Sequence, residues 1–185
     1  ISKTTVLQSE ETAAGFSAVL KIELKSGQTD TIAITENGGE IKIGNFTFNG
    51  QVGLSRTKDG VTIEQSMIAA TLIAQNGASL RAPFPGISGE LLGTSTSKQG
   101  ETVLELTGEH PLSEDLVGRY IIFDNDQRSD AAFLISEVLD PRKISIGKVS
   151  LFEKWTDPKN PSSGDENVIG KGDKFFIPLT RHATF

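Results

Sequence analysis

The stretch Phe16-Ser17-Ala18-Val19-Leu20-Lys21-Ile22-Glu23-Leu24 decides the fold class of this chain. Apolar side chains occupy every second position, and apart from Val19 the positions between them are polar. A period of two is typical of a β-strand with one buried face. Turn residues follow at 26–30, and a second alternating run at 31–35 returns. The two runs therefore predict a β-hairpin.

Short apolar runs continue the β pattern through the rest of the first half. Asn49-Gly50 and Lys58-Asp59-Gly60 separate them and are turn formers, so we expect a meander of strands. The run 67–74 could also pack as a short helix. The hairpin dipeptide Asn76-Gly77 directly after it favours a strand, with 78–82 returning.

Regular structure is interrupted at Pro83-Phe84-Pro85-Gly86, and the segment from Gly93 to Gly100 is rich in serine and threonine. These features predict an internal boundary between 83 and 100. We expect a first β-sandwich unit over 1–92 and a second β unit over 93–185.

The second half also reads as β structure, with strands expected at 102–106, 120–123, 131–135, 144–146, 149–152 and 175–179. Pro111 to Val117 predicts one helical turn, which Gly118 ends. The polar stretch 155–170 predicts a long loop. The expected fold class is all-β, an antiparallel β-sandwich architecture of two packed β units with one short helical turn.

Composition limits the partners of the chain. The 185 residues carry a formal net charge of −6 with a pI near 5.0, which argues against nucleic acid because phosphate binding needs a basic surface. Cysteine is absent, so neither disulfides nor a thiolate metal site are expected. The sequence has no long apolar run, which predicts no membrane span. A start at Ile1 rather than Met favours a fragment of a longer chain.

Residues for acid and base catalysis are scarce, since the chain has two histidines and one tyrosine. His110 precedes Pro111 and is expected in a solvated turn. His182 lies near the end of the chain, where fraying is common, and a site role for it requires a partner domain that covers it. Neither a serine elbow nor a glycine-rich phosphate loop is present in the sequence. We therefore expect no complete active site.

Clustered carboxylates allow a calcium hypothesis, because Asp124, Asp126 and Asp130 lie in one predicted loop. Arg128 falls where an oxygen ligand is wanted, and aspartate is also an ordinary turn former. A polar hairpin loop is the favoured interpretation. No other cofactor is expected.

Trp155 stands between an apolar run and the predicted long loop, where an aromatic face could contact a sugar ring or a neighbouring domain. The alternative is that Trp155 caps the core. Tyr120, Arg128 and His182 complete the set of candidate carbohydrate or domain contacts.

Several segments resemble the C-terminal β region of heparinase II/III-type polysaccharide lyases, namely residues 26–32, 46–51, 76–80, 117–126 and 172–179. The resemblance covers most of the chain and consists of glycine turns and strand sequences. It implies a parent protein with an N-terminal helical toroid and C-terminal β-sandwiches. Such lyases cleave uronic-acid polysaccharides by β-elimination, with tyrosine and histidine moving the proton and asparagine or arginine neutralising the carboxylate.

The resemblance implies that this chain is a non-catalytic C-terminal β domain, because the family's tyrosine and histidine cannot be matched to Tyr120, His110 or His182. The implied partners are the N-terminal catalytic domain of the parent and a polysaccharide. The implied location is the periplasm or exterior of a bacterium. Two alternatives stay open: a stand-alone carbohydrate-binding β-sandwich module, and a structural β domain of a virion or adhesin assembly.

Overall fold

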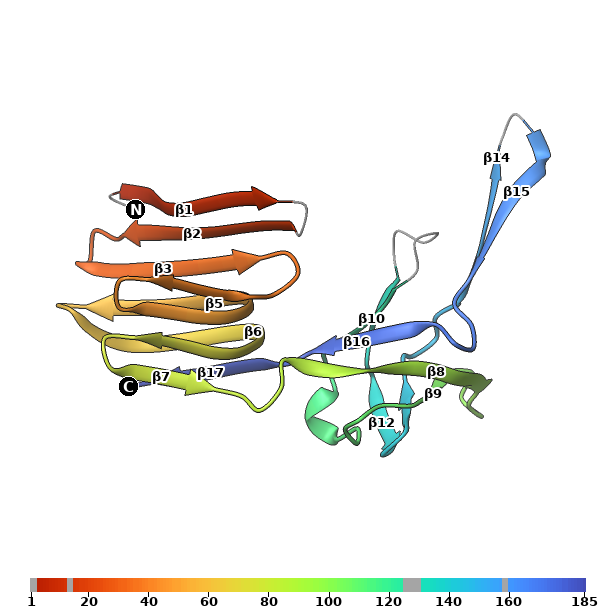
Figure 1. Ribbon diagram of the computed structural model, residues 1–185. Coiled ribbons are helices and arrows are strands. Elements are labelled where there is room, and N and C mark those ends of the chain that lie inside the picture. Colours follow the sequence, from red (N-terminus) through yellow and green to blue (C-terminus); the bar gives the residue numbers. More distant parts are fainter. Residues whose placement is uncertain (1–2, 13–14, 125–130, 158–159) are drawn as a thin grey trace. The chain divides into compact units, whose positions relative to one another are not determined.

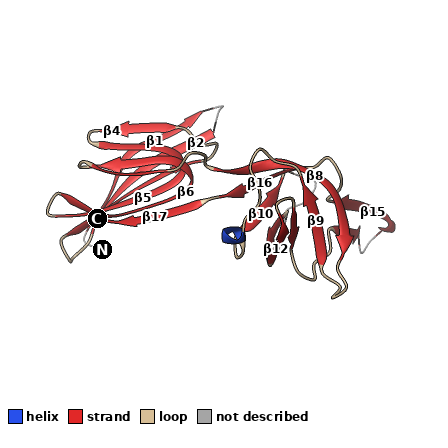
Figure 2. Ribbon diagram, turned by 90° about the horizontal axis from the view of Figure 1, so that it is seen from below, coloured by secondary structure: helices blue, strands red, loops and turns tan. Residues whose placement is uncertain are grey.

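The computed structural model describes residues 3–12, 15–124, 131–157 and 160–185; for Thr12 and for 152–168 it describes the backbone alone. The elements in these ranges are antiparallel strands and one 3-10 turn, η1 (Glu114–Leu116), drawn in blue in Figure 2. The predicted all-β, antiparallel fold with one short helical turn is confirmed. The turn covers only residues 114–116 of the predicted segment 111–117.

The chain forms two compact units. Unit 1 comprises Ile1–Gly86 and Leu179–Phe185, and unit 2 comprises Ile87–Pro178 (Figure 1). The division after Gly86 lies inside the predicted window of 83–100. The predicted second unit, 93–185, differs at its end: Thr180 to Thr184 pair with a strand of unit 1, so the last segment belongs there.

Unit 1 contains one extended sheet in the order β1-β2-β3-β5-β6-β17, with β4 paired to β5 and β7 to β6. Its strands are β1 (Lys3–Thr12), β2 (Gly15–Glu23), β3 (Gln28–Thr35), β4 (Glu40–Ile43), β5 (Phe46–Lys58), β6 (Val61–Gln75), β7 (Ala78–Arg81) and β17 (Thr180–Thr184). The predicted hairpins β2–β3 and β6–β7 are present, and the ambiguous run 67–74 is a strand.

The long strands β5 and β6 belong to two layers. The second half of β5 pairs with β3 and its first half with β4, while β6 pairs first with β17 and then with β7. The change of layer coincides with a register shift at Asn49/Gly50. Gly50 has a φ of +152°, and a Cβ there would lie 2.1 Å from the Cβ of Ala70. Only glycine lets the two strands approach this closely at the bend.

The bend places two layers face to face around one apolar core. Val19, Ala33 and Met67 of the six-stranded layer pack in one cluster with Phe48 and Ile73 of the four-stranded layer. This layer contains β4, β7, the first half of β5 and the second half of β6. The core of unit 1 is the space between these layers.

The alternating strand β3 turns its smaller and more polar side chains toward this core. Thr31, Ala33 and Thr35 are buried. The Thr35 hydroxyl donates a hydrogen bond of 2.5 Å to the Gly50 carbonyl. Ile32 and Ile34 point the other way, because neighbouring residues of a strand lie on opposite faces. The more apolar face of β3 is therefore outside.

Unit 2 is a seven-stranded sheet in the order β11-β10-β16-β8-β9-β13-β12, with a separate ribbon β14-β15. The strands are β8 (Gly86–Thr96), β9 (Thr102–Leu106), β10 (Tyr120–Phe123), β11 (Ala132–Leu134), β12 (Glu137–Asp140), β13 (Lys143–Ser145), β14 (Phe152–Asp157), β15 (Asn160–Val168) and β16 (Lys174–Pro178). In its core, Phe123 packs edge-on against Phe133 and Phe175.

Four local predictions differ from the structure. The polar stretch 155–170, expected as a loop, contains most of the β14–β15 ribbon, and the strand expected at 149–152 begins only at Phe152. Backbone pairing forms this ribbon although β15 has few strand-forming residues. The serine- and threonine-rich segment after Gly93 continues strand β8, and the end of the chain, expected to fray, is strand β17.

Candidate functional site

The outward face of the six-stranded layer in unit 1 is apolar. Its more exposed members are Val6, Phe16, Ile34, Val52 and Ile68, with exposed fractions from 37% to 58%. Half-buried aliphatic side chains fill the positions between them: Leu20, Ile22, Ile32 and Leu54. We call these nine side chains the apolar face.

Strand register aligns the apolar face into rows. Ile34 lies opposite Val52, and Val52 lies opposite Ile68. In the next row Leu20 lies opposite Ile32, and Ile32 opposite Leu54. Directly opposed residues of antiparallel strands share a face, so each row is continuous across the strands.

The apolar face is as large as the largest apolar patch on a typical soluble monomer. It extends over five neighbouring strands about 4.8 Å apart and about 15–20 Å along them, which gives roughly 400 Å². Contiguous apolar patches of this size on soluble proteins are often functional. The area is also about half of the roughly 800 Å² that each partner contributes to a standard protein interface.

The four-stranded layer of unit 1 presents an opposite character. Glu40, Lys42, Asn49, Ser79 and Arg81 are exposed on its outward side. The Lys42 ammonium and the Glu40 carboxylate form an exposed ion pair of 2.7 Å. We call this side the polar face. The same sandwich therefore has one face suited to water and one suited to contact.

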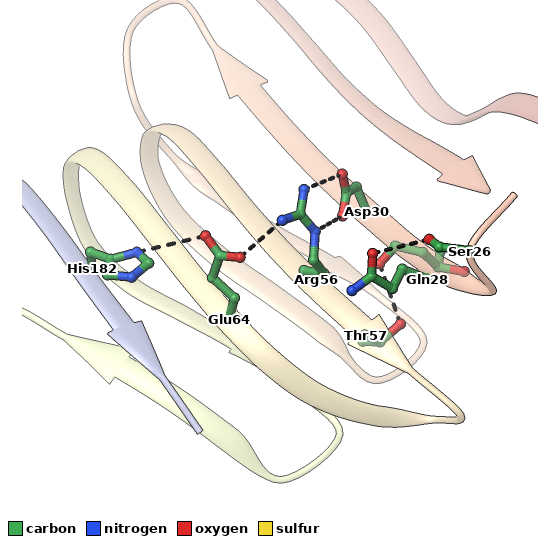
Figure 3. A network of polar contacts seen from close by, with 8 residues as sticks. Ser26, Gln28, Asp30, Arg56, Thr57, Glu64 and His182 are labelled. Atoms are coloured by element: carbon green, nitrogen blue, oxygen red, sulfur yellow. Dashed lines mark hydrogen bonds and ion pairs between the residues drawn. The ribbon is translucent and has the colours of Figure 1, made fainter. Parts of the chain in front are cut away.

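A row of charged side chains crosses β3, β5 and β6, and Figure 3 shows its members Asp30, Arg56 and Glu64. Asp30 on β3 lies opposite Arg56 on β5, and Arg56 lies opposite Glu64 on β6. The guanidinium donates a hydrogen bond to each carboxylate oxygen of Asp30. The bond from Nε is 2.7 Å long and the bond from Nη2 is 3.0 Å long. Its Nη1 donates to Glu64 Oε2 in 3.0 Å. One cation thus bridges two carboxylates across three strands.

The environment of Arg56 favours the charged form of its side chain. Hydrogen bonding to Asp30 raises the pKa of Arg56 above its usual range and outweighs the opposing effect of partial burial. The side chain of Asp30 is only 10% exposed. A guanidinium that binds a carboxylate through two parallel hydrogen bonds holds both groups in a fixed geometry. The row is therefore a rigid polar edge to the apolar face.

His182 on β17 lies opposite Ser66, in the row next to the charged row. Its Nδ1 lies 2.8 Å from Ser66 Oγ and 3.9 Å from Glu64 Oε1. In a Ser-His-acid triad the serine and the acid occupy opposite ring nitrogens. Here both approach the same nitrogen, so the group lacks the geometry of an activated nucleophile. The predicted contact residue His182 belongs to the rim of the outward six-stranded surface.

The other predicted site residues do not form one group in the described structure. Tyr120 lies on β10 of unit 2 with 54% of its surface exposed. Trp155 is part of strand β14, and its side chain lies outside the description. Arg128, Asp126 and Asp130 also lie outside the described residues.

Among the residues that the structure describes, no cluster of carboxylates supports the calcium hypothesis. Asp124 is exposed, and its backbone N–H donates to the Lys174 carbonyl in 2.9 Å. No group of three or more histidine, aspartate or glutamate side chains suited to a metal occurs in the described ranges. No helix in the same ranges is long and apolar enough to cross a membrane.

The chain matches no family model, no curated protein and no solved structure. The site is therefore defined by the fold alone. Sequence reasoning missed the Asp30, Arg56 and Glu64 row, because these residues come together only through the register of three strands. The alternation of apolar residues was the sequence signal for the apolar face, because Leu20, Ile32 and Leu54 occupy regular strand positions. Only the structure shows that these side chains point outward.

Proposed function

We propose that the chain is a non-catalytic β domain that docks onto and supports a catalytic domain. In this proposal it is the C-terminal β portion of a heparinase II/III-like polysaccharide lyase acting on uronic-acid-containing glycans in a bacterial periplasm or outside the cell. The observation that carries the docking role is the apolar face of unit 1, which the sandwich does not need for its own core.

The distribution of titratable residues supports a role without catalysis. Proton abstraction and protonation need two groups converging on one substrate. His110 lines a cavity in unit 2, but Tyr120, the tyrosine of the chain, is not among the residues that line it. His182 in unit 1 is hydrogen-bonded to Ser66 beside Glu64. Neither unit offers the tyrosine and histidine pair of a lyase among its described pocket residues.

The sequence resemblance supports the choice of parent. The resemblance implies a parent in which β-sandwiches accompany a helical domain, and an apolar sheet face suits burial against another folded layer. The hydrophobic centre with a charged rim also matches the anatomy of protein interfaces. The net charge of −6 disfavours a polyanion as the occupant of this face.

The test uses matched pairs of substitutions on strands β5 and β6. Val52→Asp with Ile68→Asp places two charges on the apolar face, at directly opposed positions. Thr47→Asp with Ala74→Asp is the control, because these residues are directly opposed on the polar side. Both double variants are built into the isolated chain and into the protein encoded by the complete reading frame. Thermal unfolding followed by circular dichroism checks that each variant folds.

The proposal expects the reading frame to encode a helical domain upstream of the chain. That domain, produced separately, should bind the wild-type chain and the polar-side variant, and it should bind the apolar-face variant at least about tenfold more weakly. The isolated chain should not raise the unsaturated-uronate absorbance of glycosaminoglycan or alginate. Equal binding by the two variants, cleavage by the chain alone, or a self-associated chain with no upstream domain would each refute the proposal.

A further inference from the structure

Strand β1 has one open edge. Its ten residues pair with β2, and among the described strands β1 has no neighbour on its other side (Figure 1). The backbone N–H and C=O groups along that side therefore have no strand to pair with inside the described sheet. An open strand edge of this length is a template for a strand from another chain.

The middle of β1 is apolar and exposed. Val6 is 58% exposed and Leu7 is 42% exposed. Val6 lies opposite Leu20, so the apolar face reaches the open edge. The register shift between Val6 and Gln8 adds Leu7 as the extra residue of a bulge. Apolar side chains at an open edge favour pairing with another strand.

The charges of β1 are separated along the strand. Lys3 is at its beginning, and Glu10 and Glu11 are near its end. All three side chains are exposed, and neither Lys3 nor Glu10 forms an ion pair within 4.0 Å with a described residue. This order of charges repels a parallel copy of the same strand and attracts an antiparallel copy, because opposed like charges destabilise a sheet. The charges therefore reject many other strands and favour a second copy of this chain.

The strand register shows on which side of the sheet each charge lies. Glu10 lies opposite Ser17, and Ser17 lies opposite Thr35, which is buried in the core. Glu10 is therefore on the core side of the layer. Lys3 is on the same side, because it lies three positions before the outward Val6 and strand residues alternate between faces. Lys3 and Glu10 can therefore meet across an antiparallel pair of β1 strands without mixing the two faces.

We infer that two copies of the chain pair through β1 in antiparallel order, with Lys3 of each copy opposite Glu10 of the other. In this register the two-fold axis passes between Val6 and Leu7. The bulge of one copy then lies opposite the bulge of the other, and the pairing stays continuous. Each dimer contains the contact between Lys3 and Glu10 twice, because a two-fold axis repeats every contact. The inference does not rest on the proposed function, since it needs no catalytic domain.

Pairing at β1 joins the two six-stranded layers into one sheet. The two-fold axis of an antiparallel strand pair is perpendicular to the sheet, so the apolar faces of both copies lie on the same side. Together they form one apolar surface of roughly 800 Å², the area that each partner contributes to a standard interface. Self-pairing at β1 therefore leaves the apolar face available for the docking proposed above.

The experiment measures the mass of the complete chain by sedimentation velocity from about 10 µM to about 1 mM. One pair of strand edges is small for a protein interface, so we expect a dimer with a Kd of about 100 µM. Lys3→Glu and Glu10→Lys each place like charges opposite one another at both ends of the pair. Each should weaken dimerisation at least about tenfold. Circular dichroism checks that each variant folds.

Mixing the two variants tests the register. An equimolar mixture of Lys3→Glu and Glu10→Lys restores opposite charges at both contacts, so it should dimerise about as tightly as the wild type. Glu11→Lys is the matched control, because it makes the same charge change at the next residue, which lies on the outward side opposite Phe16. Its Kd should stay within about twofold of the wild-type value.

The inference is overturned if the wild-type chain stays monomeric at about 1 mM. It is also overturned if the mixture of Lys3→Glu and Glu10→Lys fails to dimerise, or if Glu11→Lys weakens the dimer as much as Glu10→Lys does.

The apolar-face variant separates this inference from the docking proposal. Val52→Asp with Ile68→Asp changes β5 and β6 and should leave the dimer intact, because neither residue lies on β1. Loss of the dimer in this variant would mean that the copies associate through the apolar face, and it would overturn pairing at β1. A dimer that follows the charge pattern of β1, in a chain that binds no upstream domain, would remove the docking role and support the pairing.

Discussion

The two outward faces of the unit 1 sandwich are built partly from the same two strands and still differ in character. β5 and β6 place Val52 and Ile68 on the apolar face, and on the other side of the bend they place Thr47 and Ala74 on the polar side. Folding requires burial only between the layers. The apolar face is therefore not a by-product of strand composition, and a partner is expected on this side.

A substitution at the bend that separates the two faces should have the largest effect on stability. Gly50→Ala would drive a Cβ into Ala70, so we expect it to lower the free energy of unfolding of unit 1 by about 4 kcal/mol. Gly38→Ala is the control, because Gly38 has a φ of +76° with open space around it and should cost about 1 kcal/mol. Urea denaturation measures both. Equal losses would mean that the bend tolerates a side chain.

Substitutions at two adjacent residues of β3 test which face of the strand is buried. Ala33→Thr adds volume and a hydroxyl to a fully buried position and should cost about 3 kcal/mol. Ile34→Thr removes apolar atoms from a position 39% exposed and should cost about 1 kcal/mol or less. Thermal and urea unfolding of the two variants give the comparison. A larger loss for Ile34→Thr would reverse the inside and outside assignment.

The charged groups of the two faces provide a third contrast. Arg56→Gln leaves the nearly buried Asp30 without its cation, and we expect a loss of about 2 kcal/mol. Lys42→Gln removes an exposed ion pair with Glu40 and should change stability by less than about 0.5 kcal/mol. Urea unfolding at low and at high salt measures both variants. If the two substitutions cost the same, the charged row is no more than an ordinary surface pair.

The smallest effect concerns a single carboxyl group on β2. A hydrogen bond from Lys21 lowers the pKa of Glu23 below its usual range. The pair's contribution to stability is therefore fully present above the usual glutamate pKa of about 4.3 and is lost as the pH falls through the lowered value. NMR titration should show the low pKa and its return toward normal in Lys21→Gln. An identical titration curve in that variant would show that Lys21 has no influence.

Local sequence signals predicted much of the strand pattern. The Asn76-Gly77 dipeptide predicted the β6–β7 hairpin, and both residues have positive φ there. The alternation at 16–24 predicted β2. The ribbon β14–β15 could not be predicted in this way, because β15 has few strand-forming residues and pairs with β14 through its backbone.

The candidate site was less accessible to sequence reasoning. His182 was a candidate contact, but its proximity to Glu64 and Ser66 depends on a strand that returns from far along the chain. The alternating pattern predicts two faces for β3 and does not say which one is buried. Only the bend at Gly50 and the packing of Phe48 decide that Ile34 lies outside.

The return of the chain at β17 has a consequence for translation. A ribosome delivers β1 to β7, then the described strands of unit 2, and β17 after them. Until that moment the edge of β6 from Glu64 to Ile68 has no neighbour on one side. An open edge beside apolar side chains favours pairing between nascent chains. A premature stop codon after Pro178 would leave unit 2 whole and unit 1 open to aggregation.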